Sequence, residues 1–174
     1  MKYHAITISG LICSGKSSLF NALRQELNWK SYSASDFFRK WCQEHNVPLF
    51  AAELRPVELT KKIDQQMRHE IERDGNIIVE GWLAGFMTQG IPGVFKILLV
   101  CEDAERIKRF AQRENVSLDQ AKAEISKREA SLFAKWRKVY SRNDFFKPDF
   151  YDLAIDTTQL KPNEVLEKVL KSLN

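Results

Sequence analysis

The stretch ITISGLICSGKSS, residues 6–18, runs from a short apolar strand pattern through a glycine-rich turn to a lysine. It fits the pattern G-x-x-x-x-G-K-[ST], with Gly10, Gly15, Lys16 and Ser17 at the fixed positions. Glycines let the backbone curl around a phosphate group with its N–H groups pointing inward, and the start of a following helix adds positive potential. The stretch therefore predicts a P-loop that binds a nucleoside triphosphate.

The residues after this loop strengthen the prediction, because SLFNALRQEL, residues 18–27, has a helical pattern. In this setting we expect Lys16 to meet the β- and γ-phosphates of ATP, and the Ser17 hydroxyl to be a ligand of Mg²⁺. Cys13 is interpreted as a variable position of the loop. The residues predicted to contact ATP are Gly10, Cys13, Ser14, Gly15, Lys16, Ser17 and Ser18.

The remaining sequence alternates short strand patterns with longer helical ones, which is typical of an α/β fold with a parallel sheet. We predict strands over residues 4–9, 31–33, 76–80, 95–101 and 153–156. Gly75 is the predicted C-cap of a helix, Ser117 and Gln120 have the spacing of a capping box, and a last helix begins after Pro162. The helix before Gly75 has an apolar residue at every fourth position: Leu59, Ile63, Met67 and Ile71.

Length and composition indicate one domain, residues 1–174, in a reducing compartment. The chain has 174 residues, of which 44% are hydrophobic, and the longest apolar run covers only residues 97–101. Its three cysteines form no C-x-x-C pair and its three histidines are scattered. We therefore expect a cytoplasmic protein that binds no membrane and no zinc.

Basic residues are concentrated in one segment. Residues 106–142 hold 11 of the 27 lysines and arginines but only 4 acidic residues, whereas the whole chain has a net charge of +4. An anionic ligand or an ordinary solvated helix would each explain this surplus. The overall charge is too small to indicate nucleic acid.

The sequence lacks the D-x-x-G and N-K-x-D patterns of a GTPase switch. A small kinase and a catalytically silent nucleotide-binding protein remain as alternatives. A kinase needs further charged groups to hold its acceptor and to stabilise the transferred phosphoryl group. The candidates for these roles are Asp36, Arg39, Glu80, Arg109, Arg113 and Arg128.

Six segments resemble the nucleoside monophosphate kinases, most closely the short cytidylate kinases of the archaeal type. They are ITISGLICSGKSS, SASDFFR (33–39), KKID (61–64), VEGWLAG (79–85), REASLFAKWRKVY (128–140) and YDLAIDTT (151–158). The resemblance covers nearly the whole chain, and VEGWLAG and YDLAIDTT are more selective than the P-loop.

This resemblance implies a P-loop NTPase fold of three layers around a five-stranded parallel sheet in the order 2-3-1-4-5. It further implies a core made of residues 1–35, 71–105 and 143–174, a helical acceptor-binding region at 36–70 and a helical lid at 106–142. Glu80 would then point at the Mg²⁺ site that Ser17 shares. We rank Glu80 above Glu102 and Asp103, because Asp103 is interpreted as the N-cap of a helix.

The same resemblance assigns roles to further residues. Acceptor binding would fall to Asp36, Arg39, Asp64 and Trp82. Lys16 and the lid residues Arg109, Arg113 and Arg128 would be catalytic, dispersing charge on the transferred phosphoryl group.

Three positions depart from the family pattern. Trp82 stands where arginine is usual, Ser35 where glycine is usual, and Lys135 where a second lid arginine is usual. A lysine keeps the charge but loses the bidentate fork, and tryptophan loses the charge altogether. These departures leave the identity of the acceptor open.

The resemblance implies ATP- and Mg²⁺-dependent phosphorylation of CMP or dCMP to CDP or dCDP by a monomer that binds no nucleic acid. One alternative is a P-loop kinase of a non-nucleotide metabolite. The other is a silent nucleotide-binding protein, against which the intact Lys16 and Ser17 argue.

Overall fold

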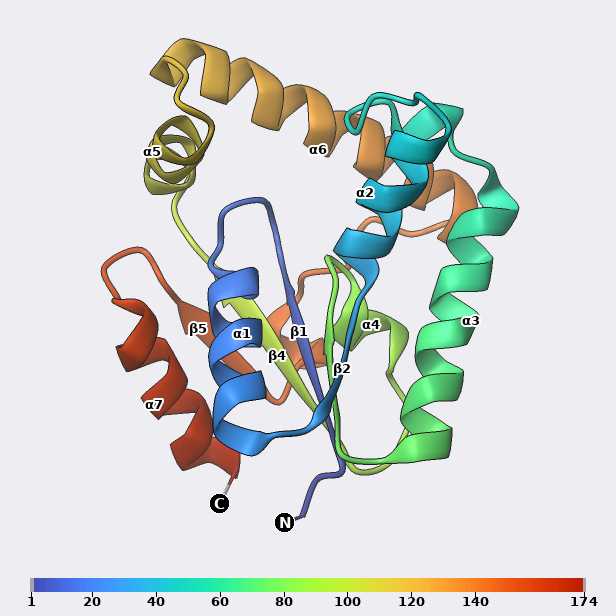
Figure 1. The fold of residues 1–174 in the computed structure, drawn as a ribbon, viewed down its shortest axis with the longest axis vertical. Helices are drawn as coiled ribbons and strands as arrows, with labels where there is room; N and C mark the ends of the chain where they lie inside the picture. Colours follow the sequence, from blue (N-terminus) through green and yellow to red (C-terminus); the bar gives the residue numbers. More distant parts are fainter. Residues whose placement is uncertain (1, 174) are drawn as a thin grey trace.

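The computed structural model describes residues 2–173, which contain a five-stranded sheet (Figure 1). Neighbouring strands are all parallel, and their order is β2-β3-β1-β4-β5. The predicted sheet is therefore confirmed, with strand ends within one residue of those expected. The strands are β1 (Ala5–Gly10), β2 (Lys30–Ser33), β3 (Ile77–Glu80), β4 (Val94–Val100) and β5 (Leu153–Asp156).

Helices cover both faces of this sheet and give three layers. One face packs against α1 (Lys16–Leu27) and α7 (Pro162–Leu173), with Leu19, Leu23 and Val169 buried between them and the sheet. The other face packs against α3 (Val57–Asp74) and the short α4 (Ala84–Met87). Three of the four apolar positions predicted for α3 are fully buried, and Leu59 is partly buried.

The remaining helices lie beyond the carboxyl ends of the strands (Figure 1). They are α2 (Ala34–Glu44), the short 3₁₀ helix η1 (Ala52–Leu54), α5 (Asp103–Glu114) and α6 (Leu118–Tyr140), and a second 3₁₀ turn, η2 (Pro148–Phe150), precedes β5. The P-loop between β1 and α1 opens at the same edge of the sheet. Ligands of open α/β sheets bind at this edge, so the fold gathers the candidate site residues there.

Three of the four predicted helix ends are confirmed, including the start of α7 at Pro162, and one is wrong. Gly75 is the C-cap of α3, and Ser117 and Gln120 form a complete capping box at the start of α6. The N-cap of α5 is Glu102, not Asp103, and no side chain caps this helix. The Asp103 carboxylate instead accepts a hydrogen bond from Arg106 at 2.6 Å. Arg106, one turn further along α5, thus engages the carboxylate that was expected to cap the helix.

No helix within residues 2–173 is long and apolar enough to cross a membrane.

Candidate active site

A cavity of about 690 Å³ lies at the carboxyl edge of the sheet, between the P-loop, α2, α3, α5 and α6. Its volume falls within the range of small-molecule sites. Most of the predicted site residues line it: Cys13, Gly15, Lys16, Ser17, Ser18, Arg39, Asp64, Glu80, Trp82, Arg109, Arg113 and Arg128. The structure therefore brings most of the predicted site residues together around one cavity.

Lys16 is the most constrained of the cavity cations. Only 7% of the residue is exposed, and its ammonium donates to the Leu11 carbonyl at 2.8 Å and lies 5.4 Å from the centre of the Trp82 ring. Burial lowers the pKa of Lys16 from 10.5 to about 8, although the Glu80 carboxylate opposes this change. A phosphate group would supply the counter-charge that Lys16 lacks in the free protein.

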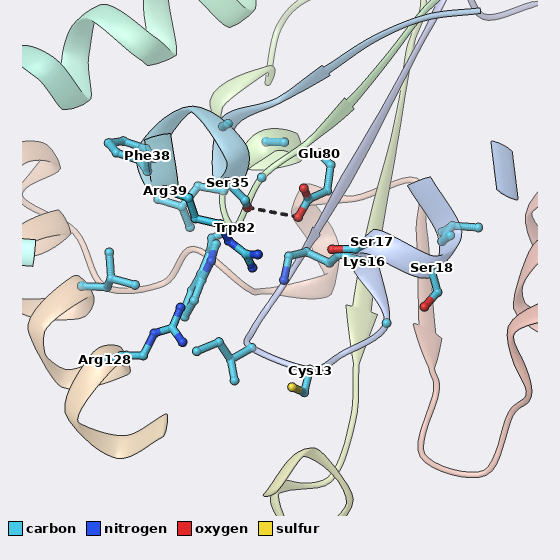
Figure 2. Close-up of a pocket in the computed structure, with 18 of the residues that line it drawn as sticks. Cys13, Lys16, Ser17, Ser18, Ser35, Phe38, Arg39, Glu80, Trp82 and Arg128 are labelled. Atoms are coloured by element: carbon cyan, nitrogen blue, oxygen red, sulfur yellow. Dashed lines mark hydrogen bonds between the residues drawn. The ribbon is translucent and has the colours of Figure 1, made fainter. Parts of the chain in front are cut away.

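Glu80 ends β3 beside the P-loop strand, because Glu80 pairs with Ile8 of β1. Its two carboxylate oxygens accept hydrogen bonds from the Ser33 hydroxyl at 2.9 Å and from the Ser35 hydroxyl at 3.1 Å. Figure 2 shows the bond from Ser35. Ser35, one of the three departures from the family pattern, thus fixes the orientation of the carboxylate. The rival acids Glu102 and Asp103 are exposed and do not line the cavity.

Three arginines from different elements carry positive charge to the P-loop side of the cavity. Arg39 comes from α2, Arg113 from α5 and Arg128 from α6. Figure 2 shows the guanidinium groups of Arg39 and Arg128 turned toward the P-loop. Burial lowers the pKa of Arg128, and the nearby Arg39 and Arg113 lower it further. Such clustering of like charges is unfavourable without an anion, so an anionic ligand would stabilise this arrangement.

Arg109 has a different environment from the one expected of a free lid arginine. Its guanidinium donates to the Thr157 carbonyl at 2.7 Å, to the Thr158 carbonyl at 3.3 Å and to the Cys13 carbonyl at 3.5 Å, and it also pairs with Glu105. These bonds connect α5 to the P-loop and to the turn after β5. Arg109 therefore positions the P-loop in this structure.

Arg106 is a site residue that the sequence did not reveal. It is 3% exposed, and its guanidinium donates to the Ile12 carbonyl at 3.2 Å and forms ion pairs with Asp103 and Glu129. The arginine thereby joins the P-loop to both α5 and α6. Because Glu129 lies 23 residues away along the chain, no local pattern could have indicated the pairing.

Trp82 lies between the P-loop and α6. One side of its indole faces the Lys16 ammonium, and its ring centre is 5.7 Å from that of Trp136 in a tilted, edge-on arrangement. The indole thus takes the place of a family arginine without replacing its charge. Both indoles line the cavity.

Asp64 lines the cavity from α3, where Tyr140 of α6 donates a hydrogen bond to its carboxylate. Burial raises the pKa of Asp64 to about 7. The hydrogen bond favours the ionised form, but burial has the larger effect. Near neutral pH this carboxyl group can therefore serve as a donor or as an acceptor.

Three predicted residues do not line the cavity. Gly10 ends β1, Ser14 is buried with its carbonyl bound to the Thr157 hydroxyl at 3.0 Å, and Asp36 is exposed. The Asp36 backbone N–H donates to Ser33, so this residue completes the N-cap of α2. The structure does not bring the Asp36 carboxylate to the acceptor side.

Burial raises the pKa of the Cys13 thiol, despite the nearby Arg113 and Lys16. An activated thiolate is therefore not favoured in the P-loop, in agreement with its interpretation as a variable position.

Ser17 and Glu80 are the groups that could hold Mg²⁺. Among the described residues no cluster of three or more histidine, cysteine or acidic side chains is placed to bind a metal. Mg²⁺ bound with a nucleotide needs fewer protein ligands, since phosphate oxygens and waters complete its shell. A hydroxyl at the start of α1 and an oriented carboxylate on the same cavity fit this requirement.

Comparison with known proteins supports the family resemblance that the sequence motifs indicate. Residues 57–159 match the model of the cytidylate kinase-like family. The chain belongs to this family. It is 34% identical to a cytidylate kinase of Thermoplasma acidophilum over 92% of this chain and 87% of that protein.

A second relative, a cytidylate kinase of Ignicoccus hospitalis, is 32% identical over 97% of this chain and 98% of its own length. Among solved structures, a gluconokinase from Sinorhizobium meliloti is similar with a TM-score of 0.66, covering 99% of this chain and 92% of that one. Its sequence identity of 12% supports the fold alone.

Proposed function

We propose that this protein transfers the γ-phosphoryl group of ATP to CMP or dCMP, giving ADP and CDP or dCDP. One observation carries the proposal: Arg39 and Arg128 face Lys16 across the same cavity. The cytidylate kinase relatives, 32–34% identical over nearly the whole chain, support the choice of acceptor. The monomeric state and the cytoplasmic location expected from the sequence stay predictions.

In this proposal the chain contributes position and charge. Lys16 contacts the β- and γ-phosphates, Arg39 holds the acceptor's phosphate, and Arg113 and Arg128 disperse the charge of the transferred group. The acceptor-binding region is residues 36–70 and the lid is residues 106–142. The helices of the lid exclude water, which would otherwise compete with the acceptor for the phosphoryl group.

Ser17 and Glu80 would hold Mg²⁺, Ser17 through its hydroxyl and Glu80 through the waters of the ion. The ion would supply charge neutralisation between the β- and γ-phosphates. Ser33 and Ser35 keep the Glu80 carboxylate in place for this role.

A purified-protein assay of ADP formation tests the choice of acceptor. We expect CMP and dCMP to give ADP well above the rate without acceptor, and UMP, AMP and a panel of phosphorylatable metabolites to give less. The Lys16→Ala variant supplies the blank for contaminating kinases. ADP formation with another acceptor, while CMP and dCMP remain at the blank, would refute the proposal.

The lowered pKa of Lys16 predicts that the protein takes up a proton when it binds ATP above pH 8. Because the pKa of Lys16 in the free protein is about 8, part of the population is neutral at pH 8.5. Phosphate contact raises this pKa, so ATP binding should take up a fraction of a proton at pH 8.5 and almost none at pH 6.5. ATP affinity should correspondingly fall as the pH rises above 8.

Calorimetric titration of ATP in buffers of different ionisation enthalpy measures this uptake. The matched control is Lys16→Arg, whose side chain stays charged and should show no uptake at either pH. Equal proton uptake by wild type and Lys16→Arg at pH 8.5 would exclude Lys16 as its source.

Trp82→Arg tests how the missing family arginine affects acceptor binding. We expect the KM for CMP to fall by about tenfold, because a charge-assisted hydrogen bond to the acceptor's phosphate contributes roughly 1.5–3 kcal/mol. Trp82→Phe, which keeps an aromatic ring, should leave this KM nearly unchanged. Steady-state kinetics at saturating ATP give both values, and an unchanged KM in Trp82→Arg would assign the indole to packing alone.

A further inference from the structure

Three side chains on one face of α6 hold residues 50–55, the segment that leads into α3 (Figure 1). They are Lys127, Ser131 and Lys135, which are four residues apart and therefore follow one another along the helix surface. The segment belongs to the predicted acceptor-binding region, and the helix belongs to the predicted lid. Two regions that were predicted separately thus contact each other over successive turns of α6.

The central contact is made by the Ser131 hydroxyl, which accepts one hydrogen bond and donates another. It accepts from the Ala52 backbone N–H at 2.9 Å and donates to the Glu53 carboxylate at 2.5 Å. Ala52 is fully buried, and buried backbone N–H groups in native proteins almost always have a partner. Ser131 therefore fixes the middle of the segment to the helix.

The flanking contacts extend the attachment to both ends of the segment. The Lys127 ammonium lies 3.5 Å from the centre of the Phe50 ring, and the Lys135 ammonium donates to the Arg55 backbone carbonyl. Lys135 is one of the three departures from the family pattern, and its ammonium is used here in the attachment. Leu49, just before the segment, and Arg55, at its end, both line the cavity. The attachment therefore positions one wall of the cavity.

The same helix carries a cation of the phosphate side. The guanidinium group of Arg128 is turned toward the P-loop (Figure 2). Burial lowers its pKa, and the like charges of Arg39 and Arg113 lower it further. An anion bound among these three arginines would relieve their repulsion and hold α6 close to the P-loop. Because α6 is continuous from Leu118 to Tyr140, the attached segment would be held with it.

We propose that α6 and residues 50–55 move as one body, with Ser131 as the positioning residue that transmits binding of the ATP phosphates to the acceptor side of the cavity. The phosphates fix Arg128 and hence α6, and α6 places the wall that Leu49 and Arg55 provide. Coupling between two sites is reciprocal, so the acceptor raises the affinity for ATP by the same factor. The inference rests on the proposed function for the identity of the acceptor.

Hydrogen exchange of the backbone amides tests this coupling without any acceptor. The probe is the non-hydrolysable β,γ-imido analogue of ATP with Mg²⁺, and the reporter is the peptide that contains the Ala52 amide. In the wild type we expect the analogue to slow exchange of residues 50–55 by at least about fivefold, the low end of typical coupling between sites. In Ser131→Ala, which lacks the central contact, the change should be less than about twofold.

Ser126→Ala is the matched control, because Ser126 is an exposed serine of the same helix and does not line the cavity. This variant should behave as the wild type does. Ser131→Thr keeps the hydroxyl and should restore the slowing. Thermal melting checks that each variant is folded, and the wild type measured with and without the analogue is a test that needs no variant.

Calorimetry measures whether the coupling reaches the acceptor. The ATP analogue should raise the affinity for CMP by about fivefold or more in the wild type and in Ser126→Ala. In Ser131→Ala the increase should be less than about twofold, because α6 no longer holds the middle of the segment.

Exchange of residues 50–55 that the analogue leaves unchanged in the wild type would overturn the proposal. Equal slowing in Ser131→Ala and in the wild type would also overturn it, because Ser131 would then transmit nothing. Slowing that Ser131→Ala abolishes, in a protein that binds no CMP, would instead refute the proposed acceptor and leave the coupling through Ser131 supported.

Discussion

Lys16→Ala should lower kcat for ADP formation by at least about 10³-fold while the protein keeps its fold. Removing the cation that faces the β- and γ-phosphates withdraws about 4 kcal/mol of transition-state stabilisation, a magnitude usual for one preorganised charged donor. The fold should tolerate the change, because the Lys16 ammonium is buried and its hydrogen bond is to a single loop carbonyl.

The measurement is ADP formation at saturating ATP and CMP, with thermal melting as the check on folding. The matched control is Lys40→Ala on α2, since Lys40 is exposed and pairs only loosely with Glu44 at 3.9 Å. That variant should retain wild-type kcat within about twofold. A Lys16→Ala enzyme that turns over within threefold of the wild type would contradict the role assigned to the P-loop.

Gly10→Ala should destabilise the protein by about 3–5 kcal/mol, within the range of severe core substitutions. Gly10 has φ of +147°, and a Cβ there would lie 2.4 Å from the Leu99 carbonyl oxygen and 2.6 Å from the Ser14 hydroxyl. The Leu99 carbonyl belongs to β4, which pairs with β1, so it cannot move without disturbing the sheet. The P-loop must shift instead, and ATP binding should be lost with stability.

Gly90→Ala is the control variant. It separates the effect of a positive φ from the effect of the steric clash with Leu99. Gly90 also has a positive φ, of +80°, but a Cβ there meets nothing within 4 Å. We expect its destabilisation to be only about 1–2 kcal/mol. Urea unfolding of the two variants gives the comparison, and equal midpoints would show that the contact with Leu99 is not the cause.

Local patterns were sufficient to predict the five strands and the P-loop. The strand order follows from a family resemblance that the register of β1 with β3 confirms, and Gly75 and Ser117 end and begin their helices as expected. These features depend on nearby residues, whose spacing is readable in one dimension.

Features that depend on distant partners could not be predicted. The role of Arg106 depends on Glu129 of another helix, 23 residues away. The N-cap prediction for Asp103 was wrong for a local reason, because Asp103 is already the first residue of α5 and its carboxylate pairs with Arg106. Arg109 has the character of a lid residue in sequence, but contacts across 48 residues tie it to the turn after β5. Arg55 belongs to no motif in the sequence, and its buried nitrogens without a hydrogen-bond partner are visible only in the structure.

Two of the three departures from the family pattern acquire a physical role from the structure. Ser35 donates to Glu80, and Lys135 donates to the Arg55 carbonyl. Trp82 covers Lys16 and contacts Trp136, but these contacts do not explain why the family arginine was replaced.

The most direct test of the account is to follow the phosphoryl group itself. The protein is incubated with ATP labelled in its γ-phosphate, CMP and Mg²⁺, and the products are separated. We predict that the label appears in CDP in a one-to-one ratio with the ADP formed, and that Lys16→Ala yields no labelled CDP. Label released only as inorganic phosphate, or remaining in ATP, would contradict the central claim.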